Sequence, residues 1–252
     1  MAYGSFRELL VLAAETGSLS SAALAHEAEE SSGTPAQVLA RMDDALAVME
    51  RSIERGLAGD AHSLSGLVGG DAKLVAENAP GLAGAGPSTA IARALAVGEV
   101  NASMGRIVAA PTGGASGVLP AVLTTIAERV GATREQTVLA LVTAAGIGAV
   151  IAARATLSGA AGGCQAEIGS AAAMAAAAAT ELAGGTPEQC GHAASFALQG
   201  LLGLACDPVG GLVEVPCVAR NATGTAVALT GMEMALAGAW FPIPLDEVIT
   251  AM

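Results

Sequence analysis

The chain has 252 residues, enough to bury a substantial core, and one domain over residues 1–252 is a simpler interpretation than two small ones. Hydrophobic residues make up 53% of the chain but aromatic residues only 2%, so the core has to be built from aliphatic side chains, many of them small. Lys and Arg total 11 against 23 Asp and Glu, and a net charge of -12 repels phosphate backbones, which argues against a nucleic-acid partner.

Helix-start patterns recur along the chain. Each pairs a hydroxyl side chain at an N-cap position with an acid or amide three residues later, where the two groups can satisfy free backbone donors reciprocally. Two of the four also have proline at the first helical position. The pairs are Ser5 with Glu8, Thr34 with Gln37, Thr133 with Gln136, and Thr186 with Gln189. They predict at least four helices.

The remaining local signals also favour helices. Residues 18–33 are the most polar part of the chain and predict a surface helix flanked by loops. Gly131 and the pair at 184–185 are typical helix stops, the latter closing an Ala-rich segment that starts near Glu167. The one convincing strand-like run is 106–110, RIVAA. We therefore expect an all-α fold in which several helices are apolar nearly all round and lie inside.

The most apolar stretch, 138–153, raises the question of a membrane span. Its 16 residues fall short of the roughly 20 that a spanning helix needs. It also lacks Lys/Arg-rich flanks that would orient it across a membrane. A buried helix is the preferred interpretation, and no membrane is expected. Because the N-terminus lacks the basic start and uninterrupted apolar segment of a secretory signal, we expect a cytoplasmic protein.

The four cysteines differ in their surroundings. Cys164 lies in GGCQAEIG, and Cys206 and Cys217 lie in ACDPVGGLVEVPC, so all three sit beside helix breakers. Gly and Pro there leave backbone N–H groups free to hydrogen-bond sulfur, and room for an inorganic cluster. Cys190 lies inside a predicted helix.

The spacing of the cysteines leaves several interpretations open. A disulfide framework suits a short secreted chain better than this one. A structural zinc site usually contains a close pair such as C-x2-C, which the sequence lacks. Free buried cysteines that act as small hydrophobic residues are common.

Four segments together indicate a family. They are SLSGLVGGDA from Ser63, NASMGRIVAAPTGGASGVLPAVL from Asn101, GGCQAEIG, and CDPVGGLVEVPC. In this order they resemble the α subunit of the bacterial iron-sulfur L-serine dehydratases. The resemblance extends over essentially the whole chain and is most specific between Ser63 and Asn221.

The resemblance implies a [4Fe-4S] cluster ligated by Cys164, Cys206 and Cys217, with one iron left without a protein thiolate. Such an iron can act as a Lewis acid on the hydroxyl of L-serine while a base removes the α-proton. The products would be pyruvate and ammonia. Cys190 is then spare.

Two Gly-rich loops are candidates for substrate binding. The loop APTGGASG offers consecutive backbone N–H groups and two hydroxyls ahead of a predicted helix, an arrangement that can bind a carboxylate. Without the resemblance, a plain connecting loop would be preferred. In many relatives one of its two central glycines is a larger residue, so a side-chain contact made there is not expected here. The candidates in this loop are Thr112, Gly113, Gly114, Ala115 and Ser116.

The loop SLSGLVGGDA provides Ser63, Ser65, Gly66 and Asp71 as further candidates, and its glycines allow it to close over a ligand. Asp71 could accept from the ammonium of the substrate, and an N-cap role fits it as well. Four polar residues within three positions of a cysteine could either support the cluster or be solvated or capping groups. They are Gln165, Glu167, Asp207 and Glu214.

The general base is assigned to His62, the best-placed of three histidines, or to a partner chain. Relatives of this family also contain a β domain with a histidine at the interdomain active site, and nothing in this chain resembles it. We therefore expect a separate β subunit, and leave a larger oligomer open. Alternatives are a cluster lyase acting on threonine, cysteine or another small amino acid, and a non-catalytic helical metal-binding or membrane-associated subunit.

Overall fold

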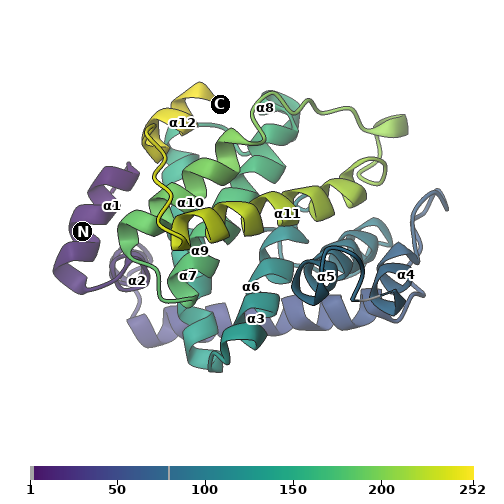
Figure 1. Cartoon of the computed structure of the whole chain (residues 1–252), viewed down its shortest axis with the longest axis horizontal. Coiled ribbons are helices and arrows are strands. Elements are labelled where there is room, and N and C mark those ends of the chain that lie inside the picture. Colours follow the sequence, from purple (N-terminus) through teal and green to yellow (C-terminus); the bar gives the residue numbers. More distant parts are fainter. Residues whose placement is uncertain (1–2, 79) are drawn as a thin grey trace.

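The computed structural model describes residues 3–78 and 80–252, which form a bundle of helices (Figure 1). A π-helical turn, η1, and a 3-10 turn, η2, interrupt the α-helices. The elements are α1 Phe6–Thr16, α2 Leu19–Glu30, α3 Pro35–Leu57, α4 Asp71–Glu77, α5 Ala85–Ala102, α6 Val118–Val130, α7 Arg134–Arg154, α8 Gly159–Gly162, η1 Gln165–Gly169, α9 Ser170–Leu182, α10 Pro187–Gln199, η2 Val209–Gly211, α11 Cys217–Leu236 and α12 Leu245–Ala251.

The predicted all-α fold is confirmed, and the strand-like run at 106–110 does not form a strand. Residues 106–110 are not helical, but no neighbouring segment pairs with them. Across the described ranges the single β-bridge is an isolated one between His62 and Gly69. A strand is stable only when another strand satisfies its backbone groups, and this fold offers none at that position.

The predicted helix starts are borne out. Full capping boxes begin α3, α7 and α10. At α1 the hydroxyl of Ser5 accepts from the N–H of Glu8, but the carboxylate of Glu8 accepts from Gly4 at 2.7 Å instead of from Ser5. Gly131 ends α6 with a left-handed φ of 67°. The Ala-rich helix starts at Ser170, after the predicted point, because a π-helical turn precedes it.

Helix α9 forms the centre of the bundle and contacts α6, α7, α10 and α11 (Figure 1). Every residue from 170 to 180 is buried, most of them alanine. Small residues on the neighbours allow close approach: a side chain at Gly224 of α11 would come within 2.7 Å of Ile168. The core is therefore built from close helix contacts and not from large side chains.

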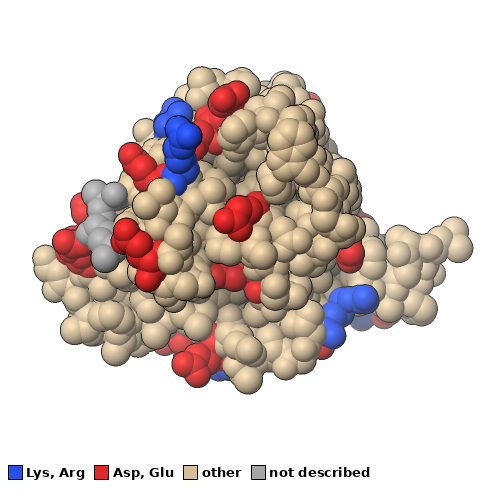
Figure 2. Space-filling view, turned by 60° about the vertical axis from the view of Figure 1, so that its left-hand side comes forward, with Lys and Arg blue, Asp and Glu red and all other residues tan. Residues whose placement is uncertain are grey.

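Helix α7 contains the apolar stretch. By length and composition α7 could cross a membrane. Helices α1 and α2 together are also long and apolar enough, but a bend of 102° separates them. In α7, 67% of the most apolar window is buried inside the protein, as expected of a core helix. The predicted polar helix at 18–33 is α2, although its Leu19 side packs inward. Acidic side chains are scattered over the face in Figure 2, where basic ones occupy isolated positions.

Candidate functional site

Three cysteines from separate segments lie close enough to interact electrostatically. Cys164 immediately precedes η1, Cys206 lies in the loop after α10, and Cys217 is the first residue of α11. Burial raises the pKa of Cys164, and Cys206 adds to that rise. Burial, followed by Cys164, raises the pKa of Cys217 to about 11, and Cys206 contributes as well. The raised pKa values of Cys164 and Cys217 mean that a cation would be needed to stabilise these two side chains as thiolates.

Local backbone contacts bring the first two cysteines together. Gly163 has a φ of 78°, and a side chain there would lie 2.9 Å from the carbonyl oxygen of Leu204. The N–H of Gln165 donates to that carbonyl at 2.9 Å, and the Gln165 side chain accepts from Gly203 at 2.8 Å. The segment before η1 is thus attached to the segment before Cys206, and glycine at 163 permits the approach.

Arg220 supplies positive charge to this group and was not predicted from the sequence. It lies one turn after Cys217, with Nη1 3.2 Å from Sγ of Cys164 and an ion pair to Asp207. The guanidinium opposes the effect of burial on the pKa of Cys164. Its spacing from Cys217 on one helix face is the signal that could have found it.

The cysteine group is not arranged around a single metal ion. Within the described residues, no three His, Cys, Asp or Glu side chains are placed to hold one metal ion. Sulfurs around one zinc ion lie about 4 Å apart, since each Zn–S bond is about 2.3 Å. An iron-sulfur cluster binds each thiolate at a different iron and so spaces them more widely. Cys190 lies apart, fully buried in α10, where burial followed by Glu181 raises its pKa.

The predicted carboxylate-binding loop lies beside α11. Asn221 holds it there: its Oδ1 accepts from the N–H of Gly117 at 2.8 Å, and its Nδ2 donates to the carbonyl oxygens of Gly114 and Cys217. The Asn221 side chain is 1% exposed. Loop and cysteine helix are therefore joined by one buried amide that the sequence alone did not single out.

Some donors of this loop are free and others are engaged. Among the described residues, the N–H groups of Gly113 and Gly114 have no hydrogen-bond partner. The buried Oγ1 of Thr112 likewise has none. The hydroxyl of Ser116, in contrast, donates to the carbonyl of Gly113 at 2.7 Å, and Ala115 is buried. The free donors lie at the start of the turn that leads into α6, where an anion is bound best.

Comparison with known proteins shows the family of this chain. The family described as "Serine dehydratase alpha chain" matches residues 14–252. A probable L-serine dehydratase alpha chain of Bacillus subtilis is 48% identical, over 99% of this chain and 84% of that protein. The L-serine dehydratase alpha chain of Peptoniphilus asaccharolyticus is 43% identical, over 91% of this chain and 80% of its own.

This chain belongs to the serine dehydratase alpha chain family. The L-serine dehydratase of Streptomyces coelicolor is 40% identical, over 97% of this chain but 55% of that protein. This chain therefore spans about half the length of that relative.

The second predicted loop is 63–72, of which residues 63–70 lie before α4, and it is tied to the loop before Cys217. The N–H of Ser65 donates to Glu214 at 3.4 Å, and the Ser65 hydroxyl also donates to that carboxylate. The hydroxyl oxygen of Ser63 lies 3.4 Å from that of Ser65 and accepts a hydrogen bond from the N–H of Val68. Hydrogen bonds from Ser65, and then from Ser63, lower the pKa of the buried Glu214.

Three further candidates lie in this loop or directly beside it. His62 is exposed beside Gly69, where a side chain would overlap its Nδ1, and Gly66 is exposed with a φ of 75°. Asp71 is the exposed first residue of α4. The alternative of an Asp71 N-cap is wrong, because Gly70 takes that position and the buried carboxylate of Glu99 accepts from the N–H of Ala72 at 3.0 Å.

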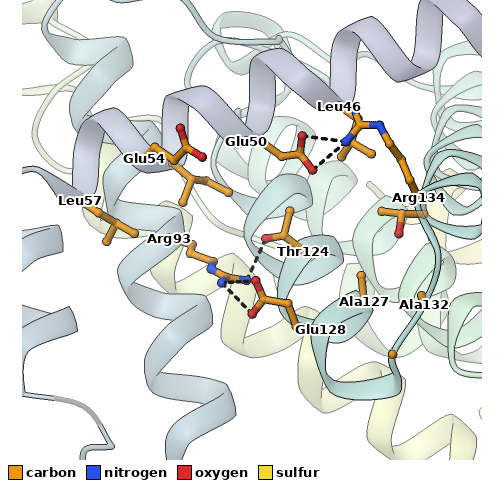
Figure 3. Close-up of a pocket in the computed structure, with 13 residues that line it drawn as sticks. Leu46, Glu50, Glu54, Leu57, Arg93, Thr124, Ala127, Glu128, Ala132 and Arg134 are labelled. Carbon is orange, nitrogen blue, oxygen red and sulfur yellow. Dashed lines mark hydrogen bonds and ion pairs between the residues drawn. The ribbon is translucent and has the colours of Figure 1, made fainter.

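A cavity of about 750 Å³ lies away from the cysteines (Figure 3). It opens between α3, α5, α6 and α7 and is crossed by ion pairs of Arg93 with Glu128 and of Arg134 with Glu50. None of the predicted site residues lines it. This cavity is therefore separate from the predicted site residues.

Proposed function

We propose that this chain is the catalytic α subunit of an L-serine ammonia-lyase that converts L-serine to pyruvate and ammonia. A [4Fe-4S] cluster would be held by Cys164, Cys206 and Cys217. The observation that carries the proposal is the approach of these three thiols beside a loop with free backbone donors. When bound, the cluster supplies a Lewis acid for the hydroxyl of the substrate.

The residues of this chain account for binding and orientation. The N–H groups of Gly113 and Gly114 and the hydroxyl of Thr112 would donate to the carboxylate of serine. Asn221 keeps these donors at a constant distance from Cys217. Arg220 favours the thiolate form of Cys164, which a metal ligand requires.

The proton-transfer group is proposed to come from His62 or from a separate β subunit. His62 is exposed and has no described contact with the cysteines, so a partner that covers loop 63–70 would be needed to bring it into use. The names of the Bacillus and Peptoniphilus relatives specify an alpha chain, and the Streptomyces relative is much longer. These comparisons support a β partner for this chain.

The test is anaerobic reconstitution with iron and sulfide, followed by measurement of pyruvate from L-serine with and without a β subunit. We expect a brown protein that forms pyruvate when the β subunit is present. Threonine and cysteine serve as competing substrates, and a higher kcat/KM for either would reassign the substrate. A reconstituted complex without lyase activity on any of the three would contradict the proposal.

A further inference from the structure

Glu167 lies close to both the cysteines and the carboxylate-binding loop. It lies on η1, three residues after Cys164, and its charge adds to the rise in pKa of Cys164 and Cys217. A side chain at Gly114 would lie 3.7 Å from both of its carboxylate oxygens. At Gly159 a side chain would overlap the same carboxylate. Glycine at 159 therefore leaves room for the Glu167 side chain, which lies between α8 and the loop at contact distance from position 114.

The Glu167 carboxylate has no hydrogen bond or ion pair with any described residue. The other carboxylates around the site are engaged: Glu214 by Ser65, and Asp207 by Arg220. Arg220 contacts Cys164 and Asp207 through Nη1 and makes no ion pair with Glu167. A partly buried carboxylate without a partner favours a cation in the space that it faces.

L-Serine has three polar groups, and two already have a place in the proposed site. Its carboxylate is assigned to the N–H groups of Gly113 and Gly114, and its hydroxyl to the cysteine side. In an α-amino acid the ammonium and the carboxylate are borne by the same carbon, so the ammonium acceptor has to lie next to the loop. Glu167 has that position, whereas the earlier candidate, Asp71, lies on α4 near Glu99.

We propose that Glu167 accepts the α-ammonium of the substrate and so makes the site selective for amino acids over the corresponding simple acids. This inference rests on the proposed function, because it assumes that serine binds between the loop and the cysteines. The π-helical turn is consistent with it, since such turns are frequent at functional sites. Glu167 then acts through charge and hydrogen bonding.

The test compares two ligands that differ only in the ammonium. L-Alanine and propionate share a carboxylate and a methyl group, and neither has a hydroxyl to eliminate. Their dissociation constants are measured anaerobically by calorimetry on the reconstituted complex of both subunits, for the wild type, Glu167→Gln and Glu167→Asp. Glu188→Gln, an exposed carboxylate on α10, is the matched control.

We expect Glu167→Gln to weaken L-alanine binding by about 10- to 100-fold, the effect of losing a hydrogen bond to a charged group, while propionate binding is unchanged. Glu167→Asp should retain part of the preference for L-alanine over propionate, and Glu188→Gln should retain all of it. The iron content of each variant should stay at the wild-type level. KM for L-serine should rise more than kcat falls.

Equal loss of both ligands, or loss of iron, would overturn the inference in favour of a structural role. So would an unchanged preference in Glu167→Gln. Absence of turnover in the wild type would count against the proposed function, whereas the alanine-to-propionate preference and its response to Glu167 can be measured without turnover.

Discussion

Asn221 accepts a hydrogen bond from the N–H of Gly117 at 2.8 Å, across 104 positions of the chain. The same amide donates to Gly114 and Cys217, so one side chain sets the distance between the proposed carboxylate-binding loop and the cysteine helix. A side chain at Gly117 would lie 3.0 Å from Oδ1 of Asn221, which shows how closely loop and helix approach.

Asn221→Ala is expected to lower the free energy of unfolding by about 1–3 kcal/mol, because it leaves buried backbone groups without partners. It should also raise KM for L-serine, since the loop loses its attachment to α11. Thermal unfolding and steady-state kinetics would measure both effects. Asn78→Ala, at an exposed position, is the control and should change neither. A wild-type KM in a destabilised Asn221→Ala would show that the loop is positioned by other contacts.

Ser65→Ala is expected to change the acid dependence of stability. The pKa of Glu214 lies below its ordinary value of 4.5 because of hydrogen bonds from Ser65 and Ser63. A carboxyl with a lowered folded pKa contributes stability above pH 4.5, and that contribution is lost as pH falls through the folded pKa. Ser65→Ala should therefore be less stable at pH 7 and lose less stability on acidification. Denaturant unfolding between pH 3 and 7 measures this, with the exposed Ser158→Ala as control.

Glu99 should produce the opposite pH dependence. Its carboxylate is fully buried, and burial raises its pKa above 4.5 despite a hydrogen bond from Ala72. The folded state then binds a proton that the unfolded state has released, so stability falls as pH rises from 4.5 through the folded pKa. Glu99→Gln, which cannot ionise, should reduce this decline. Unfolding experiments from pH 4.5 to 8 would measure this decline, with the exposed Glu77→Gln as the control. If stability fell with pH as steeply in Glu99→Gln as in Glu77→Gln, the raised pKa of Glu99 would be refuted.

Gly56→Ala tests the close packing of α3 against α5. A methyl group there would overlap the backbone of Ala96, which cannot move without shifting a helix. We expect a loss of about 1–3 kcal/mol in the free energy of unfolding, typical of overpacking in a core. In the control, Gly86→Ala, the added methyl group meets only the end of the flexible Arg129 side chain, so the loss should be smaller. Equal losses of stability in the two variants would show that the packing around Gly56 is loose.

Cysteine replacements separate the proposed cluster ligands from the spare thiol. Single changes of Cys164, Cys206 or Cys217 to Ser should each abolish or strongly reduce bound iron after anaerobic reconstitution. Cys190→Ser should keep the wild-type iron content, because Cys190 is buried in α10 apart from the other three. Iron and sulfide analysis with the visible absorption spectrum measures this. Iron retained in all three ligand variants would remove the cluster from the proposal.

The sequence by itself determined the helical class, several helix ends and the segments that carry the proposed site. These depend on neighbours a few residues apart: a Thr and a Gln three positions on begin α3, α7 and α10, and a glycine with positive φ ends α6. The cysteines and the Gly-rich loops were found for the same reason, since their signal lies in adjacent residues.

The tertiary structure alone decided how those segments meet. Ser65 and Glu214 are 149 positions apart, and no local pattern links them. The run at 106–110 has strand propensity but no strand to pair with. At the start of α4, the N–H of Ala72 donates to the distant Glu99 and not to Asp71. Buried polar groups take whichever partner the packed helices bring within hydrogen-bond distance, so these contacts follow from the completed bundle and not from neighbouring residues.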